Sequence, residues 1–154
     1  MKTTRAPFQV LVFPVTFDEK SNEPLYATFR RNKETGGYWQ GIAGGGEGSE
    51  SPEEAAVRES NEESGITTNS KLIRLESTST IPVEYVSGFI WGKDVLVIPE
   101  HSFGIEVKSQ DFTLSSEHTE YQWLNYKDTR DVLHWDSNKN ALWELNHRLS
   151  NKPI

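Results

Sequence analysis

The sequence predicts an α+β fold, and three observations lead to that prediction. With 154 residues, the chain can form one hydrophobic core and is too short for two ordinary domains. Segments rich in β-branched and aromatic residues flank one strongly capped helix, and a second helical pattern lies near the C-terminal end. Strands mixed with two helices are typical of the α+β class. We therefore expect residues 1–154 to form a single domain.

The first elements form a predicted hairpin. Residues 8–17 have the composition of a long strand, in which Pro14 indicates a sheet edge or a bulge. After a polar turn, residues 25–29 are expected to return as its partner. A short apolar segment at 38–42 precedes three consecutive glycines at 44–46. There the backbone is expected either to follow an unusual path or to approach another group closely.

The first helix is the most strongly signalled element. Ser51 is a suitable N-cap, Pro52 occupies the first helical position, and Glu54 completes a capping box. Gly65 suits the left-handed conformation that ends many helices, so the helix is expected to extend to about residue 64.

The C-terminal half is less regular. Four segments have strand-like composition: residues 72–75, 85–91, 95–98 and 121–124. The pattern between them, at 99–120, predicts no defined element. A last helix is expected at 138–149, with Ser137 as its cap and with leucines spaced to face a core.

Composition excludes several classes of function. Sixteen Lys and Arg residues against 23 Asp and Glu residues give a net charge of −7, which argues against binding a nucleic acid polymer over a wide surface. The chain has no cysteine, so disulfide scaffolds, thiolate zinc sites and cysteine nucleophiles are absent. No apolar stretch approaches the roughly 20 residues of a membrane helix, and no signal peptide is recognisable. We expect a soluble cytoplasmic protein that binds no membrane.

The first helix gathers acidic residues on one side. At about 100° per residue, Glu59, Glu62 and Glu63 share an arc of about 100°. Like charges four residues apart destabilise a helix slightly, so packing does not explain the cluster. Divalent cations would explain it, because Mg²⁺ prefers carboxylate oxygens together with substrate phosphates. The alternative is a solvated acidic surface. Arg58 lies beside Glu62 on the same wheel, and Glu50 is a plausible partner for it.

These residues form a longer pattern. Gly44, Glu50, Arg58-Glu59, Glu62-Glu63 and Gly65 occur at the spacing of the Nudix box, so the chain resembles the Nudix hydrolase superfamily. One position departs from the pattern: Ser60 stands where the family usually has a bulky apolar residue.

The resemblance implies an α/β/α sandwich with a mixed β-sheet and hydrolysis of a nucleoside diphosphate linked to another group, with Mg²⁺ or Mn²⁺ as cofactor. By matching positions, it implies the following metal-site residues: Gly44 through its backbone, Glu59, Glu62 and Glu63. The resemblance of segment 117–124, given below, adds Glu117 from a later loop; the alternative is that Glu117 is an exposed loop acid. The catalytic base is expected among Glu59, Glu63 and Glu117, and the motif is supported by Glu50, Arg58 and Gly65.

Two short segments, 117–124 and 135–142, resemble the bacterial dATP pyrophosphohydrolases, a group that includes dihydroneopterin triphosphate pyrophosphohydrolase. The expected substrate is therefore a small nucleotide such as dATP, or a pterin triphosphate, cleaved to the monophosphate and pyrophosphate. Arg30 and Arg31 are expected to face phosphate, and Trp39 either packs in the core or stacks on a base. His118 is expected to orient a neighbour. Alternatives are hydrolysis of dinucleoside polyphosphates or nucleotide sugars, and a non-catalytic nucleotide-binding module. The oligomeric state, including a homodimer, stays open.

Overall fold

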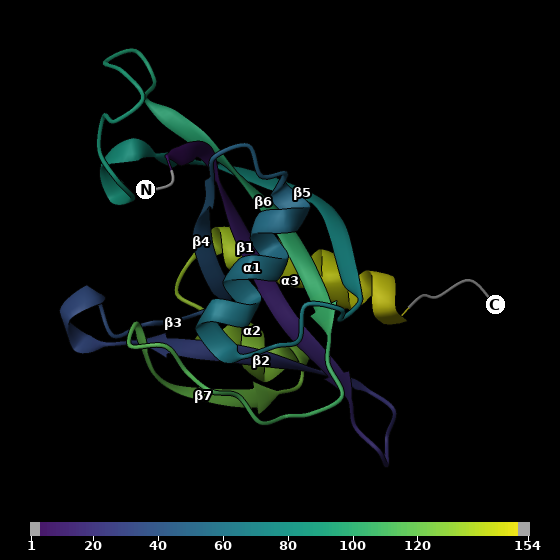
Figure 1. The fold of residues 1–154 in the computed structure, drawn as a ribbon. Helices are drawn as coiled ribbons and strands as arrows, with labels where there is room; N and C mark the ends of the chain where they lie inside the picture. The colour runs from purple at the N-terminus through teal and green to yellow at the C-terminus, as the bar shows by residue number, and fades with distance from the viewer. Residues whose placement is uncertain (1–3, 151–154) are drawn as a thin grey trace.

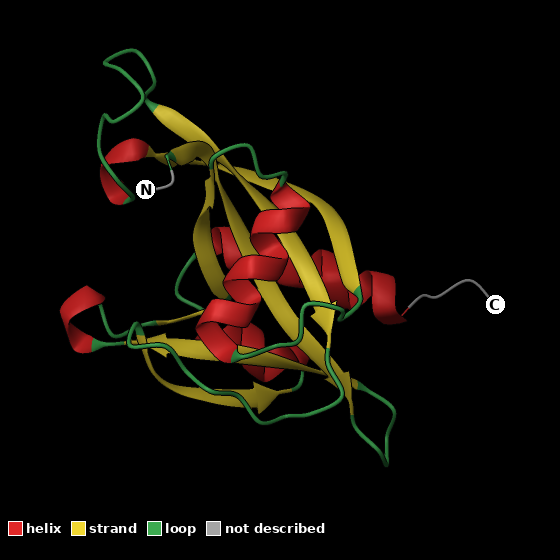
Figure 2. Cartoon of the chain, in the orientation of Figure 1, coloured by secondary structure: helices red, strands yellow, loops and turns green. Residues whose placement is uncertain are grey.

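The computed structural model describes residues 4–150, which form one mixed sheet with helices on both faces (Figure 1). The strands are β1 (Arg5–Phe17), β2 (Pro24–Arg31), β3 (Trp39–Gln40), β4 (Ile42–Glu47), β5 (Leu72–Pro82), β6 (Val97–Glu106) and β7 (His118–Leu124). The helices are α1 (Pro52–Ser64), α2 (Tyr126–Val132) and α3 (Asp136–Ser150), with short 3-10 turns η1 (Lys33–Thr35) and η2 (Val83–Tyr85). Figure 2 shows how these elements are distributed between helix, strand and loop.

Strand β1 organises the sheet. It pairs in parallel with β6 on one side and antiparallel with β4 and then β2 on the other. The predicted hairpin of β1 and β2 is thus confirmed, but the edge or bulge expected from Pro14 is wrong for this strand. Pro14 lies in a central strand, between residue 12, which pairs with β4, and residue 15, which pairs with β2. Proline is tolerated where β1 changes from one partner to the other.

Alternation along β1 divides the core into two layers. Val10 and Val12 pack in the cluster that contains Ala55 and Ala56 of α1. Leu11 and Phe13 point to the opposite face, into the cluster that contains Leu142 and Leu145 of α3. Figure 1 accordingly shows α1 on one face of the sheet, with α2 and α3 on the other. This is the α/β/α sandwich with a mixed sheet that the resemblance implies.

Several elements differ from the prediction. The strand expected at 85–91 is wrong: the chain forms η2 and turns there, and Phe89 and Ile90 are exposed. The strand expected at 95–98 is the beginning of the longer β6, and helix α2 was not predicted. Helix α3 starts at Asp136, so Ser137 lies inside its first turn and is not the cap. Within residues 4–150, no helix is long and apolar enough to cross a membrane.

Candidate active site

Helix α1 is fixed at both ends, as predicted. The Ser51 hydroxyl accepts a hydrogen bond from the Glu54 amide at 3.1 Å, and the Glu54 carboxylate accepts one from the Ser51 amide at 2.9 Å. Gly65 ends the helix with a φ of 75°. Ser60, the departure from the family pattern, is fully buried, and its hydroxyl donates to the Ala56 carbonyl at 2.7 Å. The helix therefore docks closely with a small residue at this position.

Arg58 connects α1 to the glycine-rich strand β4. Its guanidinium donates two hydrogen bonds to the Glu50 carboxylate, at 2.8 and 3.1 Å, which confirms the expected pair. It also donates to the Gly45 carbonyl at 2.8 Å, to Glu59 at 3.0 Å and to Glu62 at 3.1 Å. The carboxylates of Glu50 and Glu59, Glu50 first, raise the pKa of Arg58, so it stays charged and holds the acidic residues in place.

Glu59 lies against the backbone of β4. A Cβ atom on Gly44 would overlap the Glu59 carboxylate, so only glycine leaves room for this contact. The three glycines lie within strand β4 and none has a positive φ, so close approach is the reason for them. Burial, together with the nearby carboxylates of Glu63 and Glu62, outweighs the effect of Arg58 and raises the pKa of Glu59 to about 7.

Glu63 is held by the loop before β7. Its carboxylate accepts a short hydrogen bond of 2.5 Å from the Ser115 hydroxyl, and Nδ1 of the buried His118 lies 3.3 Å away. Burial alone would raise the pKa of Glu63, but His118 and Ser115 together keep it below its usual value. His118 thus contacts a carboxylate in the way expected of an orienting residue.

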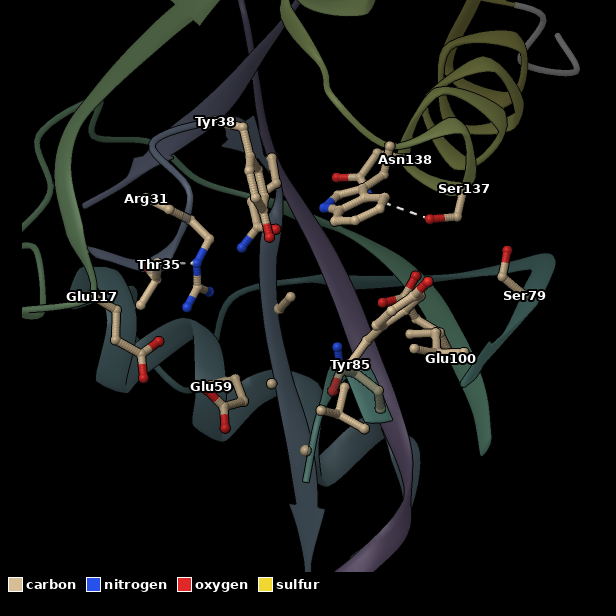
Figure 3. A pocket seen from close by; sticks show the side chains of 18 of the residues that line it. Arg31, Thr35, Tyr38, Glu59, Ser79, Tyr85, Glu100, Glu117, Ser137 and Asn138 are labelled. Carbon is tan, nitrogen blue, oxygen red and sulfur yellow. Dashed lines mark hydrogen bonds between the residues drawn. The ribbon is translucent and has the colours of Figure 1, made fainter. Parts of the chain in front are cut away.

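A cavity of about 850 Å³ lies beside this cluster and continues to the N-terminal end of α3. The acidic residues that line it are Glu59, Glu62, Glu63, Glu100, Glu117 and Asp136. Figure 3 shows Glu59 and Glu117 on one side with Arg31 and Thr35, and Glu100, Ser137 and Asn138 on the other. We call the side with Glu59 and Glu117, next to Glu62 and Glu63 of α1, the acidic end of the cavity.

Only one of the three expected substrate-binding residues lines the cavity. Arg31 lines the cavity and donates to the Thr35 hydroxyl at 3.2 Å. Arg30 does not line it; its guanidinium donates to the Gly37 carbonyl at 3.0 Å and to Glu120 at 3.3 Å. Trp39 also lies outside the lining, where its carbonyl accepts from the amide of His134. Of these three residues, Arg31 lines the cavity and Arg30 and Trp39 do not.

Several lining residues were missed by sequence reasoning: Gln9, Tyr38, Gln40, Tyr85 and Glu100. Tyr38 stacks on His134 with 4.5 Å between ring centroids and meets Trp135 edge-on at 5.4 Å. The Asn138 side chain accepts a hydrogen bond from the buried Gly41 amide at 3.0 Å, which joins α3 to the start of β4. In the sequence, an isolated glutamine or glutamate within a strand does not indicate a binding site. Tyr38 is adjacent to Trp39, a candidate substrate-binding residue, and this position could have indicated it.

The donors at the acidic end fit a divalent metal ion. In residues 4–150, no three carboxylate or imidazole groups converge on one point as they stand, because Arg58 binds Glu59 and Glu62 while Ser115 and His118 hold Glu63. All the donors are hard oxygen ligands, which divalent ions such as Mg²⁺ prefer. Release of Glu59 and Glu62 from Arg58 would free them to coordinate a cation.

The chain is similar in sequence and in fold to proteins of one known family. The family model of the NUDIX domain matches residues 7–143. A Listeria monocytogenes protein assigned as a NUDIX hydrolase is 39% identical, with coverage of 95% of this chain and 96% of its own and a TM-score of 0.83. The Escherichia coli dihydroneopterin triphosphate pyrophosphohydrolase is 22% identical, with coverage of 94% and 99% and a TM-score of 0.70. A Caenorhabditis elegans Ap4A hydrolase is 16% identical, with coverage of 94% and 98% and a TM-score of 0.71.

A curated octanoyltransferase from Myxococcus xanthus is 30% identical over 99 residues. That alignment covers 62% of this chain but spans only a quarter of the length of the transferase, so it carries no activity over. The two more distant structures likewise show the fold alone. The family model, by contrast, spans most of the chain and includes the acidic helix, the glycine-rich strand and Arg58. This chain therefore belongs to the NUDIX hydrolase family.

Proposed function

We propose that this chain is a pyrophosphohydrolase that uses Mg²⁺ or Mn²⁺ and cleaves a nucleoside triphosphate such as dATP, or dihydroneopterin triphosphate, to the monophosphate and pyrophosphate. The observation that carries the proposal is that Glu59, Glu62 and Glu63 of α1 line one cavity together with Glu117. The proposal of a triphosphate substrate comes from the segments 117–124 and 135–142, which resemble that group of pyrophosphohydrolases.

Three carboxylates and a backbone carbonyl would hold the metal: Glu59, Glu62, Glu63 and the carbonyl of Gly44. The bound ion supplies Lewis acidity and the positive charge without which a triphosphate would be repelled by these acids. Glu117 is exposed beside them and carries no ion pair within residues 4–150, which suits a base that accepts a proton from the attacking water. Arg31 faces the same space and would offset phosphate charge.

The remaining side chains would position the substrate. Arg58 keeps Glu59 and Glu62 close to β4 before the metal binds, so that binding would only exchange their contacts with the guanidinium for contacts with the ion. Tyr38 and Trp135 expose aromatic surface to the cavity, where a heterocycle would stack.

A substrate panel tests the proposal. Nucleoside triphosphates, dihydroneopterin triphosphate, dinucleoside polyphosphates and nucleotide sugars are incubated with Mg²⁺, and the products are identified by chromatography. We expect pyrophosphate and a monophosphate from a triphosphate. Two nucleotides from a dinucleoside polyphosphate, or a sugar phosphate, would favour the alternative hydrolases. Binding with no turnover of any compound would indicate a non-catalytic module and contradict the proposal.

A further inference from the structure

Glu100 is a buried carboxylate that the proposed metal chemistry does not use. It lies on β6 directly beside Gln9 of β1, on the sheet face that α3 covers. It is 4% exposed, lines the cavity, and one of its oxygens, Oε1, has no hydrogen-bond partner. No basic side chain forms an ion pair with it in the described part of the chain. A buried carboxylate oxygen without a hydrogen-bond partner is costly, and a ligand that donates to it would offset that cost.

Two polar side chains contact Glu100 and leave one of its oxygens without a partner. An Arg5 guanidinium N–H donates to Oε1 of Gln9 at 3.0 Å, which turns the amide nitrogen of Gln9 away from Arg5. The side chains of Gln9 and Ser137 hydrogen-bond to Glu100, and these bonds oppose the effect of burial, which nevertheless raises its pKa. A small rotation about the last side-chain bond, which is soft in glutamate, presents the unpartnered oxygen to the cavity.

The position of Glu100 suits recognition of a heterocycle. If the acidic cluster holds the polyphosphate, the ring of the substrate extends to the opposite side of the cavity, where Glu100, Ser137 and Asn138 lie (Figure 3). The aromatic side chains of Tyr85 and Trp135 also line that cavity. Two carboxylate oxygens match a ring N–H beside an exocyclic amine, because both groups donate in parallel. Guanine and pterins have this edge, whereas adenine presents a ring-nitrogen lone pair beside its amine.

We propose that Glu100 is the specificity-determining residue of this site and that it selects a 2-amino-4-oxo heterocycle, a guanine or a pterin, over adenine. This proposal rests on the proposed function for the placement of the polyphosphate, and among the substrates named there it favours dihydroneopterin triphosphate over dATP.

Binding of uncharged nucleosides tests the proposal without turnover. Guanosine, inosine, which lacks the 2-amino group, and adenosine are titrated into the metal-free protein and followed by NMR. We expect guanosine to bind about tenfold more tightly than either of the others. The Glu100→Gln variant should lose this preference, and Glu106→Gln, the same change on the same strand outside the cavity, should keep it. Equal binding of the three nucleosides, or a preference for adenosine, by the wild-type protein overturns the proposal even if the variants fail to fold.

Triphosphate assays with Mg²⁺ separate this proposal from the proposed function. If the wild type cleaves GTP and ATP with equal kcat/KM and Glu100→Gln leaves that ratio unchanged, selection by Glu100 is refuted while the pyrophosphohydrolase stands. If guanosine binding depends on Glu100 but no triphosphate is cleaved, the binding site is supported and the proposed function is refuted.

Discussion

Glu144 of α3 is expected to stabilise the fold because its carboxylate accepts hydrogen bonds from the backbone of strand β5. The pairing of β5 with β6 is interrupted between residues 74 and 78. In that interval the Glu144 carboxylate accepts hydrogen bonds from the amides of Glu76 and Ser77, at 2.8 and 2.7 Å, and from the Ser77 hydroxyl at 2.6 Å. Arg148 adds a further bond at 2.7 Å. Replacement by glutamine removes the charge and leaves one acceptor oxygen for these donors.

The magnitude follows from the pKa. Burial alone would raise the pKa of Glu144, but the donors from Ser77, Glu76 and Arg148 lower it from 4.5 to about 2. A pKa difference of this size between the unfolded and folded states corresponds to about 3 kcal/mol in the free energy of unfolding. Since the amide oxygen of glutamine still accepts one or two bonds, we expect Glu144→Gln to lower the free energy of unfolding at pH 7 by about 2 kcal/mol. The melting temperature should fall by about 4–8 °C.

The pH dependence gives the sharper test. Because the folded pKa is depressed, the contribution of the charge is fully present above pH 4.5 and is lost as the pH falls towards 2. Urea denaturation at pH 7 and at pH 3 should therefore show a large difference between wild type and variant at pH 7 and a smaller one at pH 3. Glu76→Gln is the control, since its exposed carboxylate lies 3.9 Å from the same Arg148. Equal losses from both variants, or a difference that does not change with pH, would refute the reasoning.

Three further predictions concern the site. Glu59→Gln should reduce hydrolysis at least about a hundredfold and abolish thermal stabilisation by Mg²⁺, while Glu53→Gln, on the exposed side of the same helix, retains both. Arg58→Lys keeps the charge but loses the two-pronged bond to Glu50, so kcat should fall about tenfold or more with little change in KM; wild-type kinetics would contradict that role. Gly44→Ala introduces a Cβ that overlaps the Glu59 carboxylate, and Mn²⁺ affinity, measured by calorimetry, should decrease at least about tenfold in a protein that still folds.

The parts of the structure that depend on neighbouring residues could be predicted from the sequence. The capping box of α1, its glycine stop and the Arg58–Glu50 pair all lie within 16 residues of one another and were correctly predicted. The helix α2 was missed although Asn125, whose side chain accepts from the Asp128 amide, gives a local N-cap signal. Its seven residues are too short for a clear helical period.

The parts that depend on long-range pairing could not be predicted. The segment 85–91 has strand-like composition, but within residues 4–150 it pairs with no strand, so Tyr85 and Phe89 stay exposed. Trp91 is half-buried and donates from its indole N–H to the Arg5 carbonyl of β1. The role of Glu100 depends on the parallel pairing of β6 with β1, which brings it beside Gln9, 91 positions earlier in the chain. Its burial and its missing partner become visible only when α3 covers that face.

A crystal structure with Mn²⁺ and a non-hydrolysable triphosphate analogue tests the central claim most directly. Anomalous scattering locates the ion without reference to the protein model. We expect Mn²⁺ within about 2.0–2.3 Å of carboxylate oxygens of Glu59, Glu62 and Glu63, bridging to the phosphates, with Arg58 still bonded to Glu50. A bound analogue whose phosphates lie away from α1, with no anomalous peak at these three carboxylates, would contradict the account.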